Sequence, residues 1–264
     1  MYPPQRIVCL TEETVETLYL LGEDHRIVGV SGYAVRPPQV RREKPRVSAF
    51  ISADIDKIVA LEPDLVLTFS DLQADIVAAL IRRNIAVHAF NQRDVAGIFA
   101  MIRTLGALVG APTKAETLAE SLNRRLADAR ERKTRLPRAP RIYFEEWDDP
   151  MISGLKWVSE LIEVAGGVEI FPELAQGKNA KDRIVTAEQV IAAQPDIVVG
   201  SWCGKKFVPA KVAARPGFTA IPAVRTGHLR EIKSTIILQP GPAALTDGLD
   251  ALVRIVDEWA AQAA

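Results

Sequence analysis

Polar and aromatic side chains follow the predicted strands of this 264-residue chain, at the points where those strands end. Those of the first half are Glu12, Tyr33, Ser70, Asp71 and Gln92, and those of the second half are Glu146, Trp147, Trp202, Cys203, Lys205 and Gln239. The carboxyl ends of parallel strands meet at one edge of a sheet, and open α/β sheets bind ligands at this edge. These residues are therefore the predicted ligand-binding set.

Two of the four tryptophans, Trp147 and Trp202, stand at strand ends in the second half of the chain. They form either a stacking wall for a large planar or amphipathic ligand or a cap over the top of the core. In the first case each aromatic contact contributes about 0.5–1.5 kcal/mol beyond its buried area. Trp157 and Trp259 are predicted to pack inside the protein.

Four carboxylates fall within the five residues from Glu145 to Asp149. This run is predicted to be a solvated loop, with a cation or amine site and a carboxylate pair for acid–base chemistry as the alternatives. Lys205 and Lys206, on another loop, are partners either for these acids or for an anionic group of a ligand.

Cys203 could ligate a metal through its thiolate, but no histidine stands near it in the sequence. No metal site is therefore predicted. The sequence also contains no G-x-S-x-G, no Walker A motif and no histidine-centred cluster. We therefore predict no catalytic residues and a protein that is not an enzyme.

The elements that must position these residues include one segment that occurs twice. A short amphipathic helix, a Pro-Asp pair and a buried strand run over residues 55–67 and again over residues 187–199. Proline ends the helix because it cannot continue the hydrogen-bond ladder. The apolar run after it is typical of a strand buried on both faces of a parallel sheet. Similar helices and strands flank both copies, so the sequence predicts two α/β lobes of similar topology.

A long helix is predicted between the two copies, over residues 113–135, which are rich in Ala, Leu, Glu, Arg and Lys. A helix of this length spans about 34 Å and can join two domains. The predicted division is an N-terminal lobe over 1–110, a connecting helix over 111–137 and a C-terminal lobe over 138–264. We interpret the mixed-charge surface of the helix as solvated, with nucleic-acid contact as the alternative.

The charge balance and the apolar runs exclude other classes of protein. Lys+Arg and Asp+Glu both number 33, so no general attraction to nucleic acid is expected. No apolar run is long enough to span a bilayer.

No signal peptide is recognised at the N-terminus, which indicates either a cytoplasmic protein with Met1 as its native start or a mature form with an added Met1. Cys9 lies in an apolar run and is predicted to be a buried small hydrophobe.

The whole chain resembles a known family in this organisation and in several motifs: residues 55–65 (IDKIVALEPDL), Arg46-Val47, Ser31-Gly32-Tyr33 and Phe50. It is similar to the cobalamin- and siderophore-binding class of ABC-transporter solute-binding proteins, and within it to the vitamin B12-binding branch. The resemblance implies a fold of two Rossmann-like lobes with parallel sheets joined by a single long α-helix, as in class III periplasmic binding proteins.

The same resemblance implies a function and roles for residues. The ligand would be cobalamin or a related corrinoid, bound between the lobes for delivery to an ABC importer, with no cofactor besides this ligand. Tyr33 and Phe50 match positions of ring-stacking aromatics, and Asp56 and Glu188 match acids that dock on arginines of the transporter's membrane subunits. The protein would be a periplasmic monomer. The alternatives are a siderophore or haem binder of the same fold, and a cytosolic corrinoid-handling protein or enzyme.

Overall fold

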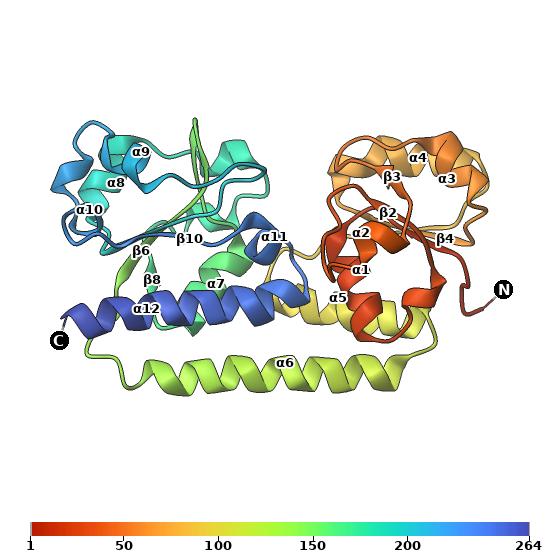
Figure 1. Ribbon diagram of the computed structural model, residues 1–264, viewed down its shortest axis with the longest axis horizontal. Coiled ribbons are helices and arrows are strands. Elements are labelled where there is room, and N and C mark those ends of the chain that lie inside the picture. The colour runs from red at the N-terminus through yellow and green to blue at the C-terminus, as the bar shows by residue number, and fades with distance from the viewer. Residues whose placement is uncertain (1, 264) are drawn as a thin grey trace. The chain divides into compact units, whose positions relative to one another are not determined.

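The computed structural model describes residues 2–263, apart from the side chain of Ala263, and divides them into two compact units (Figure 1). Unit 1 comprises the chain up to Gln92 together with Ala96–Ser121. Unit 2 comprises Arg93–Val95 and the chain from Leu122 onward. The predicted bilobal α/β fold is confirmed, and each unit is described below by itself.

Unit 1 contains a five-stranded parallel sheet in the order β3-β2-β1-β4-β5. Its strands are β1 (Ile7–Cys9), β2 (Ile27–Ser31), β3 (Arg46–Ser48), β4 (Leu65–Phe69) and β5 (Val87–Phe90). Its helices are α1 (Glu12–Leu20), α2 (Val40–Glu43), α3 (Ile55–Ala60), α4 (Ala74–Arg82) and α5 (Val95–Leu108), with short 3₁₀ turns η1 (Asp24–Arg26) and η2 (Asp71–Gln73). Cys9 on the central strand is fully buried, as predicted, and burial raises the pKa of its thiol to about 12.

Unit 2 contains a sheet in the order β10-β9-β6-β7, with β8 also paired to β6. Its strands are β6 (Arg141–Asp148), β7 (Met151–Ser153), β8 (Val168–Glu169), β9 (Ile197–Gly200) and β10 (Leu229–Glu231). Its helices are α7 (Lys156–Val164), α8 (Ala187–Ala193), α9 (Pro209–Ala213), α10 (Pro222–Arg225), α11 (Ser234–Ile237) and α12 (Leu249–Ala263), with short turns η3 (Leu174–Gln176), η4 (Ala180–Arg183), η5 (Phe218–Ala220) and η6 (Ala244–Gly248). Strand β7 runs antiparallel to β6 in a hairpin, which the sequence did not predict.

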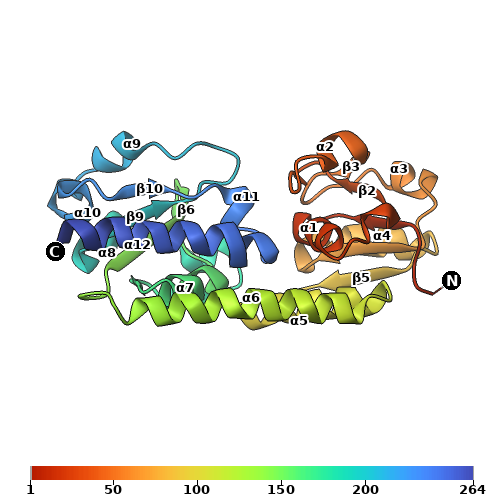
Figure 2. The same cartoon turned by 60° about the horizontal axis from the view of Figure 1, so that its bottom comes forward.

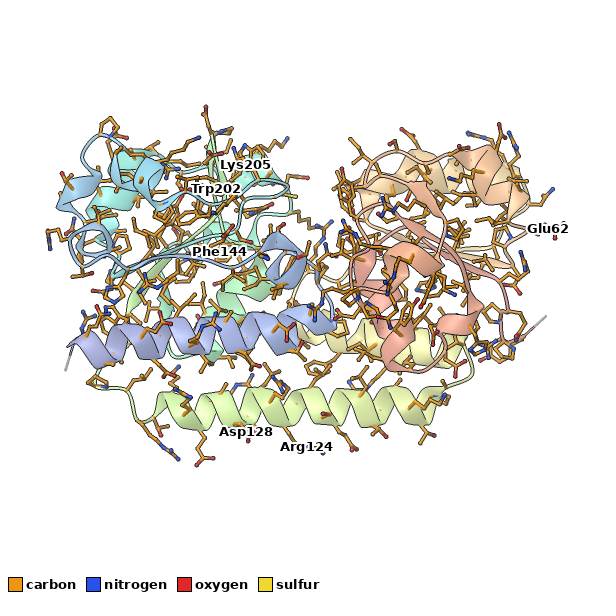
Figure 3. The ribbon with its side chains drawn as sticks, in the orientation of Figure 1. Glu62, Arg124, Asp128, Phe144, Trp202 and Lys205 are labelled. Carbon is orange, nitrogen blue, oxygen red and sulfur yellow. The ribbon has the colours of Figure 1, made fainter. Side chains whose placement is uncertain are left out.

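The long helix α6 (Pro112–Lys133) matches the predicted helix to within two residues at its C-terminal end. Its buried residues recur at helical spacing: Ala115, Ala119, Leu122, Leu126 and Ala129. In unit 2, Arg125 and Arg132 form ion pairs with acids of α12, which lies alongside this part of α6 (Figure 2). Arg124 and Asp128 are exposed and point away from the helix (Figure 3), as expected for a solvated surface. No helix within residues 2–263 combines the length and apolarity that crossing a membrane requires.

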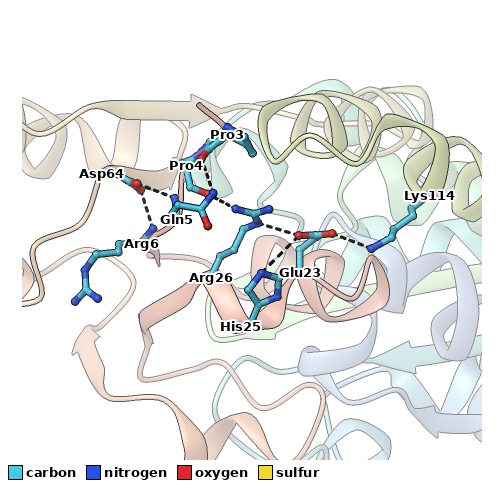
Figure 4. Close-up of polar contacts among 9 residues, drawn as sticks. All are labelled: Pro3, Pro4, Gln5, Arg6, Glu23, His25, Arg26, Asp64 and Lys114. Carbon is cyan, nitrogen blue, oxygen red and sulfur yellow. Dashed lines mark hydrogen bonds and ion pairs between the residues drawn. The ribbon is translucent and has the colours of Figure 1, made fainter. Parts of the chain in front are cut away.

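The repeated Pro-Asp pair has the same structural role in both units. In unit 1, the Asp64 carboxylate accepts the N–H groups of Gln5 and Arg6 at 2.7 and 2.9 Å, while the Asp64 N–H donates to the Arg6 carbonyl (Figure 4). In unit 2, the Asp196 carboxylate accepts the Arg141 N–H at 2.8 Å, and the Asp196 N–H donates to the Arg141 carbonyl. Each aspartate therefore fixes the start of one central strand beside the strand that follows the proline.

The contribution of Asp196 to stability can be tested by replacing it. Its carboxylate also accepts two hydrogen bonds from Arg138, at 2.7 and 2.9 Å. Burial alone would raise the pKa of Asp196, but the bonds from Arg138 and the Arg141 N–H outweigh it and hold the pKa below its usual value. We expect Asp196→Asn to cost about 2 kcal/mol of unfolding free energy at pH 7. The difference should shrink as the pH falls through the folded-state pKa, because the wild type then loses this stabilisation. Urea unfolding followed by tryptophan fluorescence measures it, and equal stability at pH 7 would contradict the assignment.

Candidate functional site

The predicted residues of unit 1 lie at the carboxyl edge of its sheet, on loops that follow different strands. Tyr33 follows β2 and its side chain is 56% exposed. Phe50 follows β3 and is half-buried, whereas Asp71 follows β4 and is exposed. Glu12 begins α1 directly after β1 and is half-buried. The structure therefore brings these four residues to one edge of one sheet.

Exposed apolar side chains occupy the same loops. Ile51, beside Phe50, is 70% exposed, and Leu72, beside Asp71, is 52% exposed. Together with Tyr33 and Phe50 they form what we call the apolar rim of unit 1. Ile51 and Leu72 were not predicted from the sequence, since an isolated aliphatic residue after a strand is typical of the core. Their high exposure on neighbouring loops identifies them as candidate ligand contacts.

The remaining two residues of this half are buried. Ser70, after β4, is 7% exposed and donates its N–H to the Phe90 carbonyl at 2.7 Å. Gln92, after β5, is 6% exposed and its amide faces Glu13, with 3.5 Å between Nε2 and Oε1. Burial, followed by the charge of Glu12, raises the pKa of the Glu13 carboxyl to about 8. Direct ligand contact by Ser70 and Gln92 stays a prediction.

The prediction of a solvated loop over residues 145–149 is wrong for most of its length. Residues 145–148 belong to strand β6, and Glu145 is fully buried. Its carboxylate accepts two hydrogen bonds from Arg215, at 2.5 and 2.9 Å, and one from Trp202 Nε1 at 2.9 Å. A buried carboxylate is tolerated where such partners compensate for lost hydration. Glu145 thus links β6 to Trp202, which follows β9, and to Arg215, which follows α9.

The next two acids of β6 are also paired with cations. Glu146 forms an ion pair with the buried Arg183, and Asp148 forms one with Lys205. The Lys205 ammonium lies 4.0 Å from the ring centroid of Trp147, which is half-buried. This cation–π contact places the ring of Trp147 beside the charge at the strand end.

Trp202 occupies the core in addition to bonding Glu145. Its side chain is 4% exposed, and its ring packs edge-on against Phe207 with 5.0 Å between centroids. Figure 3 shows it within unit 2 close to Lys205, whose ammonium lies 5.4 Å from the ring centroid. This burial favours the capping role over an open stacking wall, and direct ligand contact by Trp202 stays a prediction.

The other predicted residues of unit 2 lie on separate loops. Cys203 is exposed, and Gln239, after α11, is half-buried. Among residues 2–263 no three His, Cys, Asp or Glu side chains come together in a group that could hold a metal ion.

The two predicted docking acids stand at equivalent places in the two units. Asp56 lies in the first turn of α3, with 84% of its side chain exposed, and accepts a hydrogen bond from Arg83 at 3.0 Å. Glu188 lies in the first turn of α8 and is exposed. The backbone N–H of Glu188 and then the Thr186 side chain lower the pKa of its carboxyl. Both carboxylates are therefore accessible at the surface of their units.

Comparison with known proteins defines the class. The family model "Periplasmic binding protein" matches residues 7–236, so this chain belongs to the periplasmic binding protein family. It is a solute-binding protein of that family, whose members bind small molecules.

The sequences of three relatives align with at least 90% of this chain. The chain is 24% identical to a vitamin B12-binding protein of Vibrio parahaemolyticus over 265 residues, covering 97% of this chain and 90% of that one. It is 25% identical to a cobalamin-binding protein of Halobacterium salinarum, covering 90% of this chain and 66% of that one. An ABC transporter substrate-binding lipoprotein of Bacillus subtilis is 25% identical over 96% of this chain and 80% of its own length.

Two solved structures have the same fold. The periplasmic vitamin B12-binding protein of Vibrio cholerae superposes with a TM-score of 0.77 at 23% identity, covering 97% of this chain and 98% of that one. A periplasmic haem-binding protein of Roseiflexus superposes with a TM-score of 0.80 at 23% identity, covering 96% and 99%. The expected class III periplasmic-binding-protein fold is confirmed.

Proposed function

We propose that this protein captures cobalamin or a related corrinoid outside the cytoplasmic membrane and delivers it to an ABC importer. The observation that carries the proposal is the apolar rim of unit 1, where the exposed Tyr33, Ile51 and Leu72 and the half-buried Phe50 offer ring and aliphatic surface to a large ligand. The vitamin B12- and cobalamin-binding relatives support this ligand. The protein would act as a monomer and bind its ligand without altering it chemically.

The pairing of three loop cations of unit 2 with acids favours a ligand without net negative charge, whereas the exposed Lys206 would still accept an anionic group. Arg183, Lys205 and Arg215 are each paired with an acid of β6, and Arg36 forms a 2.9 Å bond to Glu16 in unit 1. An anionic ligand would have to compete with these carboxylates for the cations, at a cost in desolvation. A corrinoid bearing neutral amide side chains needs only hydrogen bonds and apolar contacts.

Haem or an iron–siderophore complex is the second candidate. Its specific support is the exposed Tyr33, whose phenol oxygen could ligate iron, together with the fold shared with a haem-binding protein. Haem carries two carboxylates, which the paired cations described above are poorly placed to accept. The two candidates are therefore separable by binding.

Transfer to the importer would use Asp56 and Glu188, one exposed acid on each unit. Arginines on the membrane subunits are their proposed partners. Because Asp56 already bonds Arg83, docking at unit 1 would exchange one guanidinium for another.

Titration with cyanocobalamin and separately with haemin tests the proposal. All four tryptophans lie in unit 2, so their quenching reports ligand binding there, and the visible corrin spectrum provides an independent signal. We expect binding of cyanocobalamin at micromolar or lower concentration, and loss of about tenfold in affinity in Tyr33→Ala. Glu120→Gln, an exposed change on α6, should bind as the wild type does. Haemin binding without cyanocobalamin binding would overturn the corrinoid proposal in favour of the second candidate.

A further inference from the structure

We propose that Gln73 is a positioning residue of the ligand site, because its buried side-chain amide holds three loops of unit 1 together at the carboxyl edge of the sheet. The inference rests on the proposed function, since these loops include Phe50 and Ser70. Gln73 is fully buried at the end of the 3₁₀ turn η2. Because its side chain is excluded from solvent, it would act through the loops it bonds.

Each polar atom of the Gln73 amide has a backbone partner. Oε1 accepts the N–H of Phe69, at the end of β4, at 2.9 Å. Nε2 donates to the Leu10 carbonyl, after β1, at 3.3 Å and to the Phe50 carbonyl, after β3, at 2.7 Å. Three strand ends thus converge on one side chain that is excluded from solvent.

The strand order explains why a side chain is needed for this link. In the order β3-β2-β1-β4-β5, two strands separate β3 from β4, so no ladder of backbone hydrogen bonds can join the Phe50 loop to the end of β4. The loop is closed on itself by a 2.8 Å bond from the Ala49 N–H to the Ser52 carbonyl. The Gln73 amide connects this closed loop directly to the centre of the sheet.

The backbone before Gln73 supports a functional purpose for the turn. Ser70 has φ 57° and ψ 179°, a conformation that few residues other than glycine adopt. Its hydroxyl accepts the Leu72 N–H at 3.3 Å, which stabilises the start of η2. Such backbone strain persists where the surrounding structure imposes it, and it is concentrated at ligand sites. The sharp turn carries Gln73 back under the loops while Leu72 faces outward on the apolar rim.

A purely structural role would produce a different pattern of effects. A buried amide that only stabilised unit 1 would, when replaced, lower stability without changing how the folded protein binds. A positioning residue changes the binding of the folded protein through Phe50. The difference between these roles is measurable because Phe50 can itself be replaced.

The test combines Gln73→Met, which removes all three bonds at similar volume, with Phe50→Ala in a double-mutant cycle of cyanocobalamin affinity. We expect each single variant to bind about tenfold more weakly and the double variant to bind about as weakly as the single ones. Ile58→Val, a buried change in the same unit that removes no hydrogen bond, controls for lost stability and should bind normally. Additive losses in the cycle, or normal binding by Gln73→Met, would overturn the proposal.

Two further measurements keep the inference separate from the proposed function. In Gln73→Glu, the carboxylate cannot donate to Leu10 and Phe50, whereas its protonated form can donate one bond. Its affinity relative to wild type should therefore recover partly as the pH falls, unlike that of Gln73→Met. Hydrogen exchange needs no ligand: amides of residues 48–53 should exchange faster in Gln73→Met than in wild type. If the wild type binds no corrinoid, the proposed function is wrong, but the role of Gln73 is not decided by that result. Unchanged exchange of residues 48–53 in Gln73→Met would refute the role of Gln73.

Discussion

Replacing Arg215 with methionine is expected to lower the unfolding free energy of unit 2 by about 3–5 kcal/mol, because it leaves the buried Glu145 carboxylate without its charged partner. Glu145 is fully buried and receives two of its three hydrogen bonds from Arg215. Trp202 alone cannot replace the lost charge. Urea unfolding followed by tryptophan fluorescence measures the loss, since every tryptophan of the chain reports on unit 2.

Two matched variants identify the cause of this loss. Lys205→Met breaks the Asp148 pair, in which the lysine side chain is 40% exposed, and should cost no more than about 1 kcal/mol. Glu145→Gln combined with Arg215→Met should recover most of the stability, because a neutral amide can still accept the Trp202 hydrogen bond. An Arg215→Met protein as stable as wild type would show that Glu145 is not held as the structure indicates.

The Glu145–Arg215 pair is a contact that the sequence alone did not predict. The repeated helix–Pro-Asp–strand segment predicted α3, β4, α8 and β9 correctly, because local periodicity and the proline determine these elements. The acidic run was misassigned because its burial depends on partners distant in the chain. Arg215 stands 70 residues after Glu145, and Arg183 stands 37 after Glu146. No local pattern predicts that pairing.

The candidate site was predicted unevenly for a related reason. Strand ends follow from the predicted strands, so Glu12, Tyr33 and Asp71 were placed correctly at one edge of the sheet. Whether a side chain at a strand end is open or buried depends on the tertiary packing of its loop. Trp202 proved to be buried for this reason, and Gln73 was overlooked because its three backbone partners come from separate loops.

Glu13→Gln is expected to stabilise unit 1 in a pH-dependent manner. The Glu13 carboxyl is 2% exposed, and burial, followed by the charge of Glu12, raises its pKa from 4.5 to about 8. Between these two pH values the unfolded chain has released this proton while the folded protein retains it. The stability of the wild type therefore falls as the pH rises through this window and levels off above about pH 8. At about 1.4 kcal/mol per pH unit, the loss reaches the order of 5 kcal/mol.

Glutamine at position 13 does not titrate, so its advantage over wild type should be absent near pH 4 and largest at pH 8 and above. Cys9 on β1 provides the measurement, because it is fully buried and becomes reactive towards a thiol reagent only when unit 1 opens, while Cys203 is exposed and reacts at once. Corrected for the reagent's own pH dependence, the Cys9 labelling rate in wild type should exceed that in Glu13→Gln increasingly as the pH rises. The exposed Glu120→Gln should follow the wild type throughout. Equal labelling of wild type and Glu13→Gln at pH 8 would contradict this prediction. It would mean that ionising Glu13 does not lower the stability of the folded protein, because polar partners at the edge of the sheet stabilise the carboxylate.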